Sequence, residues 1–144
     1  MNLFTYGVLM HPELLRALTG HRFAGEPAAL EGFRRHGLVM EGRPRVPAIV
    51  RKAGAAVEGV LVHNVDEESL RILDAFEEVD SGLYSREPVH VLGGDGRRWA
   101  ACAYVAGPRA VGALEGSWDP EEFLERYFEE YQTRIIPRFL GLGP

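Results

Sequence analysis

Residues 83–106 read LYSREPVHVLGGDGRRWAACAYVA. Apolar and polar residues alternate through 83–92, which is the period of a strand with one buried face. The glycines at 93, 94 and 96, with Asp95 between them, are typical of a tight hairpin turn. Residues 99–106 then form the apolar return strand. This stretch predicts an antiparallel hairpin and so a sheet that is not wholly parallel.

The same patterns, followed outward, predict the other elements. Helix signals are capping residues, a proline in the first turn and a glycine after the last. Strands are expected over 2–9, 28–40 (interrupted near Gly32 or Gly37), 46–50 and 57–65, with turns at Gly42 and Gly54. Helices are expected over 13–18, between Pro12 and a closing Gly20, and from the N-cap Asp66 to about Val79. A third helix is expected over 119–136, where Leu124, Tyr127, Phe128, Tyr131 and Ile135 form an apolar stripe and Pro137 ends or kinks the helix.

This order predicts an α+β fold with a mostly antiparallel or mixed sheet, either open or curled into a barrel. A doubly wound parallel sheet is disfavoured, because strands and helices do not alternate regularly. The sequence contains no internal repeat or linker, so we expect a single domain over residues 1–144.

The composition of the chain argues against several classes of partner and of covalent chemistry. The 144 residues are 46% hydrophobic and carry a net charge of −5, which argues against a nucleic-acid partner. No run approaches the roughly 20 apolar residues of a membrane span. The single cysteine, Cys102, excludes an intramolecular disulfide, and we expect a reduced cytoplasmic setting.

One carboxylate lies where the helical pattern predicts a core residue. The apolar face of the helix that begins at Asp66 contains Leu70 and Leu73, and position 77 falls on that face four residues after Leu73. A buried carboxylate must be paired, hydrogen-bonded or protonated, and a raised pKa suits a general acid or base. Glu77 is therefore a candidate catalytic group, whereas Glu78 is expected to face solvent. The alternative is a structural role, in which an end-of-helix Glu77 bends to solvent or pairs with an arginine such as Arg86.

The second candidate is the segment from Tyr6 to Pro12, where a strand ends at Gly7 and a helix follows. Backbone N–H groups at such a junction can converge on a carboxylate or an oxyanion. With one glycine and no following lysine, it is not a phosphate loop. An ordinary strand-to-helix turn remains the alternative.

Other nucleophiles and metal sites are disfavoured. The five histidines have no metal-ligand spacing, and His11 is expected to cap the following helix. Cys102 is expected to be a buried hydrophobe, and no serine lies in a nucleophile elbow. No metal and no cofactor are therefore expected. An enzyme with these residues would use acid–base chemistry on a substrate that carries its own nucleophile.

Four motifs follow one another along the sequence. They are 4–9 (FTYGVL), 47–50 (PAIV), 57–61 (VEGVL) and 73–78 (LDAFEE), the last followed by 84–86 (YSR) and 89–91 (VHV). In this order they resemble the gamma-glutamylcyclotransferase-like family in its bacterial short form. The resemblance covers about residues 3–105 and leaves the C-terminal helix outside.

The resemblance implies a small mixed β-barrel with flanking helices and a substrate cavity. It further implies that Glu77 is the catalytic acid/base and that a γ-glutamyl amide releases an amine while 5-oxoproline forms. The residues implied to bind this small-molecule substrate are Tyr6, Gly7, Val8, Leu9, Tyr84 and Tyr104.

Two positions depart from the family pattern. Val8 replaces a common threonine, and Glu78 replaces a common glycine. These departures leave open a non-catalytic module that binds a small carboxylate-bearing metabolite. The segment 135–142 leaves the oligomeric state open between monomer and homodimer.

Overall fold

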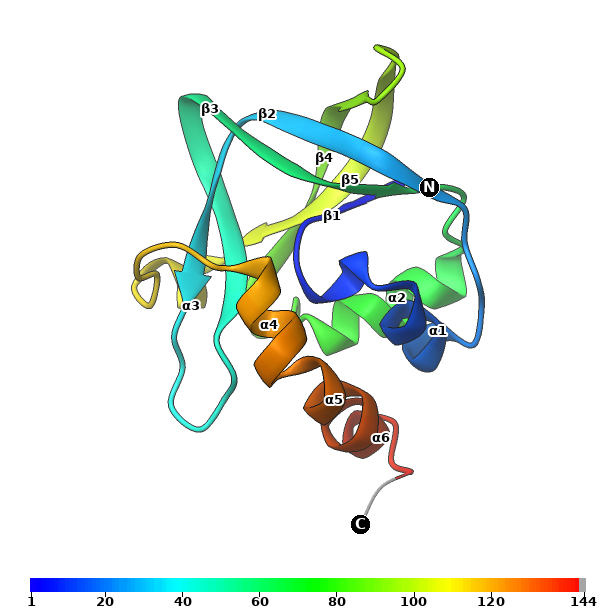
Figure 1. The fold of residues 1–144 in the computed structure, drawn as a ribbon, viewed down its shortest axis with the longest axis vertical. Coiled ribbons are helices and arrows are strands. Elements are labelled where there is room, and N and C mark those ends of the chain that lie inside the picture. Colours follow the sequence, from blue (N-terminus) through cyan, green and yellow to red (C-terminus); the bar gives the residue numbers. More distant parts are fainter. Residues whose placement is uncertain (143–144) are drawn as a thin grey trace.

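The computed structural model describes residues 1–142 as a five-stranded barrel flanked by helices (Figure 1). The strands close in the order β1-β3-β2-β4-β5; β1 runs parallel to β5, and the other pairs are antiparallel. This confirms the expected α+β fold with a mixed, mostly antiparallel barrel. No helix within residues 1–142 has the length and apolar character needed to cross a bilayer.

The predicted hairpin over 83–106 is confirmed. Strands β4 (Tyr84–Gly93) and β5 (Arg98–Ala106) pair antiparallel, with Leu92 opposite Arg98 next to the turn. Residues 94–97 reverse the chain, and Gly96 takes a φ of 86°.

Strands β2 (Gly25–Leu38) and β3 (Val46–Val62) form the longest hairpin. The expectation of two strands over 46–50 and 57–65 was wrong, because Gly54 does not reverse the chain. The register shifts between Glu31 and Phe33, and Gly54 (φ 85°) lies in the surplus segment of β3. The glycine thus provides an irregularity that bends one continuous strand.

The first strand is shorter than predicted. β1 spans only Leu3–Thr5, and a 3-10 turn, η1, follows over Val8–Met10. Helix α1 (Pro12–Thr19) ends at Gly20, whose φ of 77° confirms the predicted glycine cap. The chain leaves the sheet after Thr5, so the Gly7 segment is free of β pairing.

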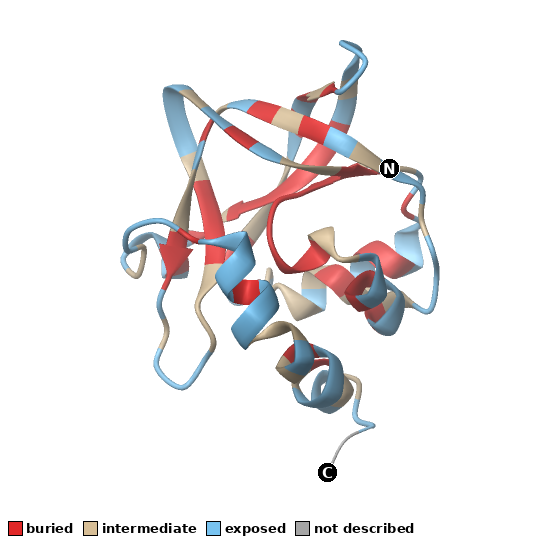
Figure 2. Ribbon diagram, viewed as in Figure 1, coloured by how far each residue is buried: buried red, intermediate tan, exposed pale blue. Residues whose placement is uncertain are grey.

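Buried residues lie on the strands and on the helices (Figure 2), and they form two core clusters. One consists mainly of strand residues that fill the barrel, including Phe4, Leu30, Ile49, Leu61 and Val91. The other joins the barrel to the helices and includes Leu3, Leu14, Leu73, Phe123 and Ile136. Leu3 and Phe4 belong to different clusters, as expected for successive residues on opposite faces of a strand.

The single helix expected over 119–136 is divided in the structure. It comprises α4 (Pro120–Arg126), α5 (Phe128–Glu130), a π-helical turn, η2 (Tyr131–Ile135), and α6 (Ile136–Phe139). Asp119 is the predicted N-cap and accepts a hydrogen bond from Glu121 N, whereas Leu124 is exposed rather than buried. The buried residues are Phe123, Tyr131 and Ile136, and the five-residue step to Ile136 matches the π turn. Pro137 lies in the first turn of α6 and does not end the helix.

Helix α2 (Glu67–Phe76) is tied to the barrel by Asp74. Arg86 of β4 donates to both Asp74 oxygens, from Nε at 2.8 Å and from Nη2 at 3.1 Å. The Tyr104 hydroxyl of β5 donates to the same carboxylate at 2.8 Å. These bonds hold the C-terminal end of α2 over the barrel.

A short helix, α3 (Pro108–Val111), follows β5.

Replacing Asp74 with asparagine is expected to lower the free energy of unfolding by about 1–2 kcal/mol, because a partly buried Arg86 loses its charged partner. The matched control is Glu68→Gln, which removes an exposed partner of Arg71 on the same helix and should cost less than about 0.5 kcal/mol. Chemical denaturation measures both. Equal losses would contradict a specific tie at Asp74.

Candidate active site

A cavity of about 480 Å³ lies at one end of the barrel, between the loop over 39–45, the end of α2 and the C-terminal helices. All seven residues predicted for the site line it: Tyr6, Gly7, Val8, Leu9, Glu77, Tyr84 and Tyr104. The fold thus brings together segments that are more than 90 residues apart in the sequence.

Glu77 lies at the C-terminal end of α2 rather than inside the helix, because the helix stops at Phe76. The Glu78 N–H donates to Ala75 O at 3.1 Å and the Val79 N–H donates to Asp74 O at 3.1 Å. These two bonds form a Schellman motif, in which the residue after the cap takes the left-handed conformation. That residue is Glu78, with a φ of 54°. The predicted end of the helix at Val79 was therefore too late.

The Glu77 carboxyl is desolvated within the cavity wall. Burial, and next the negative charge of Glu78, raise its pKa from the usual 4.5 to about 8. The C-terminal end of a helix also disfavours negative charge. Within residues 1–142 no group donates a hydrogen bond to this carboxyl, and Arg86 pairs with Asp74 instead. The alternative of a Glu77–Arg86 pair was wrong, because the Arg86 guanidinium is bound to both oxygens of Asp74.

The loop from Tyr6 to Leu9 presents unpaired backbone donors. In the described part of the chain, the N–H groups of Gly7, Val8 and Leu9 have no hydrogen-bond acceptor, while Met10 N donates to Gly7 O at 3.0 Å. A Cβ at Gly7 would overlap the ring of Pro47, so glycine permits this close approach. Arg35 donates from Nη1 to Tyr6 O at 3.0 Å and fixes the start of the loop.

The predicted tyrosines line the cavity with their rings, while their hydroxyls bind protein atoms. Tyr84 donates to Pro47 O at 2.7 Å, Tyr104 donates to Asp74 and Tyr6 donates to Tyr104 O. Burial raises the pKa of all three hydroxyls, so they remain neutral. Their rings form part of the cavity wall that Glu77 also lines.

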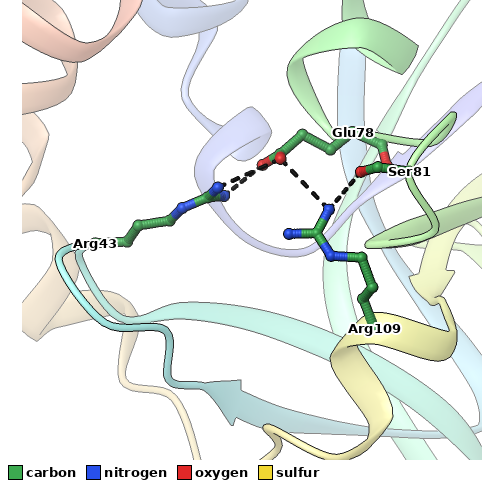
Figure 3. Close-up of polar contacts among 4 residues, drawn as sticks. All are labelled: Arg43, Glu78, Ser81 and Arg109. Atoms are coloured by element: carbon green, nitrogen blue, oxygen red, sulfur yellow. Dashed lines mark hydrogen bonds and ion pairs between the residues drawn. The ribbon is translucent and has the colours of Figure 1, made fainter.

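Glu78 was expected to face solvent, but its side chain instead lies along the cavity. Its side chain is 32% exposed and lines the cavity, where it forms ion pairs with Arg43 and Arg109 (Figure 3). The hydrogen bond from Arg43, the largest of several causes, lowers the pKa of Glu78 below its ordinary value. The left-handed backbone of a glutamate costs about 1–2 kcal/mol. The pKa values of these two neighbouring glutamates are thus shifted in opposite directions.

Among the cavity residues that were not predicted for the site are Arg43, Tyr131, Arg134 and Arg138. Arg43 lies in a loop, and no periodicity marks its orientation. Tyr131 was assigned to the core from its place in the aromatic stripe, and its ring borders both the core and the cavity. Arg134 and Arg138 lie on the same C-terminal segment and add positive charge to the wall.

Two other residues lie outside the cavity lining. His11 is at the start of α1, but its side chain makes no capping bond; it stacks on Phe123, with a centroid distance of 5.5 Å. Cys102 is buried in β5, and burial raises its pKa, as expected for an unreactive thiol. Within residues 1–142, no three His, Cys, Asp or Glu side chains could hold a metal ion together.

The described geometry agrees with comparisons to known proteins. The family described as "Gamma-glutamyl cyclotransferase, AIG2-like" matches residues 3–120. The chain belongs to this family. The match confirms the resemblance and leaves most of the C-terminal segment, including Tyr131 and Arg138, outside the matched residues.

Individual relatives support the assignment. The chain is 30% identical over 132 residues to AIG2-like protein D of Arabidopsis thaliana, covering 90% of this chain and 83% of the relative. A solution structure of another Arabidopsis thaliana protein has a TM-score of 0.68 at 26% identity, covering 95% of this chain and 91% of that one. A structure named gamma-glutamyl cyclotransferase has a TM-score of 0.67 at 18% identity, covering 100% and 88%, and shows the same fold. The two relatives above with a named organism both come from the plant Arabidopsis thaliana. The resemblance to the bacterial short form of the family therefore stays a prediction.

Gly7→Ala tests the approach of the loop to Pro47. The added methyl group must displace the loop or the proline ring, and we expect a loss of about 1–3 kcal/mol in unfolding free energy. Thermal unfolding measures the effect. Gly112→Ala is the control, because a Cβ at Gly112 meets no atom within 4 Å and the backbone is right-handed. An unchanged stability of Gly7→Ala would contradict the close packing.

Glu77 also makes the stability depend on pH. In the fold its carboxyl keeps a proton up to a pH of about 8, whereas the unfolded chain releases it near 4.5. Its contribution to stability is therefore complete below 4.5 and is lost as the pH rises to 8. Relative to wild type, Glu77→Gln should gain about 1–3 kcal/mol in unfolding free energy between pH 5 and pH 8. Urea denaturation at several pH values measures this, and a difference that is constant with pH would refute the raised pKa.

Proposed function

We propose that the protein is a cyclotransferase that releases an amine or an amino acid from a γ-glutamyl amide with formation of 5-oxoproline. The observation that carries this proposal is the desolvated Glu77 carboxyl in the same cavity as the unpaired N–H groups of Gly7, Val8 and Leu9. One group can move a proton near neutral pH, and the others can bind an oxygen that gains negative charge. Membership in the AIG2-like family supports the same reaction class.

In this mechanism the substrate supplies the nucleophile. The α-amine of the glutamyl group attacks the γ-carbonyl carbon, and a five-membered ring closes as the new C–N bond forms. The reaction is intramolecular, so the cavity contributes orientation of the substrate. The aromatic rings of Tyr6, Tyr84 and Tyr104 provide the walls that hold it.

Glu77 acts twice. As a carboxylate it accepts a proton from the attacking amine, and as a carboxylic acid it donates a proton to the departing amine nitrogen when the amide C–N bond breaks. A pKa of about 8 keeps both forms accessible near neutral pH. The N–H groups of the loop stabilise the oxyanion of the tetrahedral intermediate, and Glu77 ends the cycle in its initial state.

The charge of the cavity wall favours an anionic substrate. Arg134 pairs with Glu130 at 3.0 Å, while Arg138 has no ion-pair partner among residues 1–142. A γ-glutamyl amide carries an α-carboxylate, and an amino-acid leaving group carries a second one. We therefore infer that γ-glutamyl amino acids are better substrates than γ-glutamyl alkylamines.

A second candidate is a binding module that uses the cavity for a small carboxylate-bearing metabolite without turnover. The observation that favours it is Val8, which offers a backbone donor but no hydroxyl. Calorimetry distinguishes the candidates: binding of γ-glutamyl amides with no 5-oxoproline formed would support this one.

Incubation with γ-glutamyl amino acids and γ-glutamyl alkylamines, with chromatographic detection of 5-oxoproline, tests the proposed reaction. Wild-type protein should release 5-oxoproline, and Glu77→Gln should reduce kcat by about 10²–10⁴-fold, because glutamine keeps the shape and loses the proton transfer. The exposed Glu67→Gln on the same helix is the control and should keep full activity. Activity that survives in Glu77→Gln would disprove the role of Glu77.

A further inference from the structure

We propose that Glu78 is a positioning residue of this cavity: its carboxylate ties the loop over 39–45 and helix α3 to the turn that carries Glu77. The inference rests on the proposed function and adds a residue to it. Glu78 acts through its neighbours and is assigned no contact with the reacting atoms.

Two distant parts of the chain converge on this one carboxylate (Figure 3). Arg43, from the loop between β2 and β3, approaches both Glu78 oxygens, with Nη2 at 3.3 Å from Oε1. Arg109 of α3 lies on the other side, with Nη1 at 3.6 Å from Oε1, and also donates to the Ser81 hydroxyl. The Ser81 hydroxyl donates in turn to Glu78 O at 3.2 Å. The turn after α2 is therefore fixed by Arg43 of the loop, by Arg109 of α3 and by the hydrogen bond from Ser81 inside the turn.

The carboxylate has a role that the backbone alone does not explain. The Schellman motif requires a left-handed residue at position 78, and glycine adopts that conformation without strain. Glutamate is a poor choice for the backbone, so its side chain must provide the benefit. Single exposed ion pairs stabilise little, but a two-point contact within a network fixes geometry.

Glu78 and its two arginine partners also set the charge beside Glu77. The tyrosines that face Glu77 come from β4, β5, η2 and the loop after β1, and they are neutral because burial raises the pKa of each; they are Tyr6, Tyr84, Tyr104 and Tyr131. Arg134 and Arg138 contribute positive charge from the C-terminal segment. Glu78 is the adjacent ionised acid, and Arg43 and Arg109 keep it ionised. Without its carboxylate, the two arginines would remain and would favour ionised Glu77.

Two substitutions separate the backbone from the carboxylate. Glu78→Gly relieves the left-handed strain and removes the ties, whereas Glu78→Gln keeps the strain and removes the charge. We expect both to lower the maximal kcat at least about 10-fold with KM changed less than about 3-fold, because the acid/base is displaced from the reacting atoms. Arg43→Gln should act on the same tie, so Arg43→Gln/Glu78→Gln should lose little more than Glu78→Gln alone. Glu68→Gln is the charge-matched control on α2 and should keep wild-type kcat.

The pH profile gives a readout that a purely structural role would not move. In Glu78→Gln the rising limb of kcat/KM should shift to lower pH by about half a unit or more. Amide hydrogen exchange should rise in 39–45 and 77–82 of both Glu78 variants, whether or not a substrate is known.

The outcomes separate the two proposals. Wild-type kcat in Glu78→Gly, or an unshifted limb in Glu78→Gln, overturns the inference while the proposed function stands. A wild-type protein that forms no 5-oxoproline overturns the proposed function, and unchanged exchange in the two segments then overturns the tie as well.

Discussion

The desolvation of one carboxyl group at the end of α2 organises this protein. A helix end, three tyrosine rings and the C-terminal segment surround Glu77, and none of the described residues gives it a hydrogen bond. Such a group is unfavourable when ionised, so the fold must hold it in place by contacts made elsewhere. Asp74 anchors the same helix to β4 and β5, and the Schellman motif sets the direction in which the chain leaves the helix.

Two adjacent glutamates therefore differ in chemistry because their surroundings differ. Glu77 faces aromatic walls and holds its proton, whereas Glu78 faces two arginines and releases it. Separation of this kind allows one acid to exchange protons near neutral pH while its neighbour remains a fixed charge. The barrel contributes the rigid frame on which the loop from Tyr6 to Leu9 meets the helix end.

The sequence predicted best what depends on local pattern. The hairpin over 83–106 and the position of Glu77 follow from two-residue or helical periodicity, and the Gly20 cap follows from the conformational freedom of glycine; all three are present in the structure. Gly54 and the C-terminal segment were misassigned, because a bulge and a turn have the same glycine signal and because a π turn changes the period within an aromatic stripe. Arg43 could not be assigned to the site, since its partner Glu78 lies 35 residues away and only the closed barrel brings the two together.

Direct titration of the Glu77 carboxyl is the most direct test of this account. Carbon-13 NMR of protein labelled at the glutamate carboxyl carbons, with the Glu77 signal assigned by its loss in Glu77→Gln, reports its protonation without any substrate. The account predicts a midpoint at a pH of about 8. A midpoint near the usual 4.5 would show that Glu77 is an ordinary solvated carboxylate and would contradict the role of the cavity.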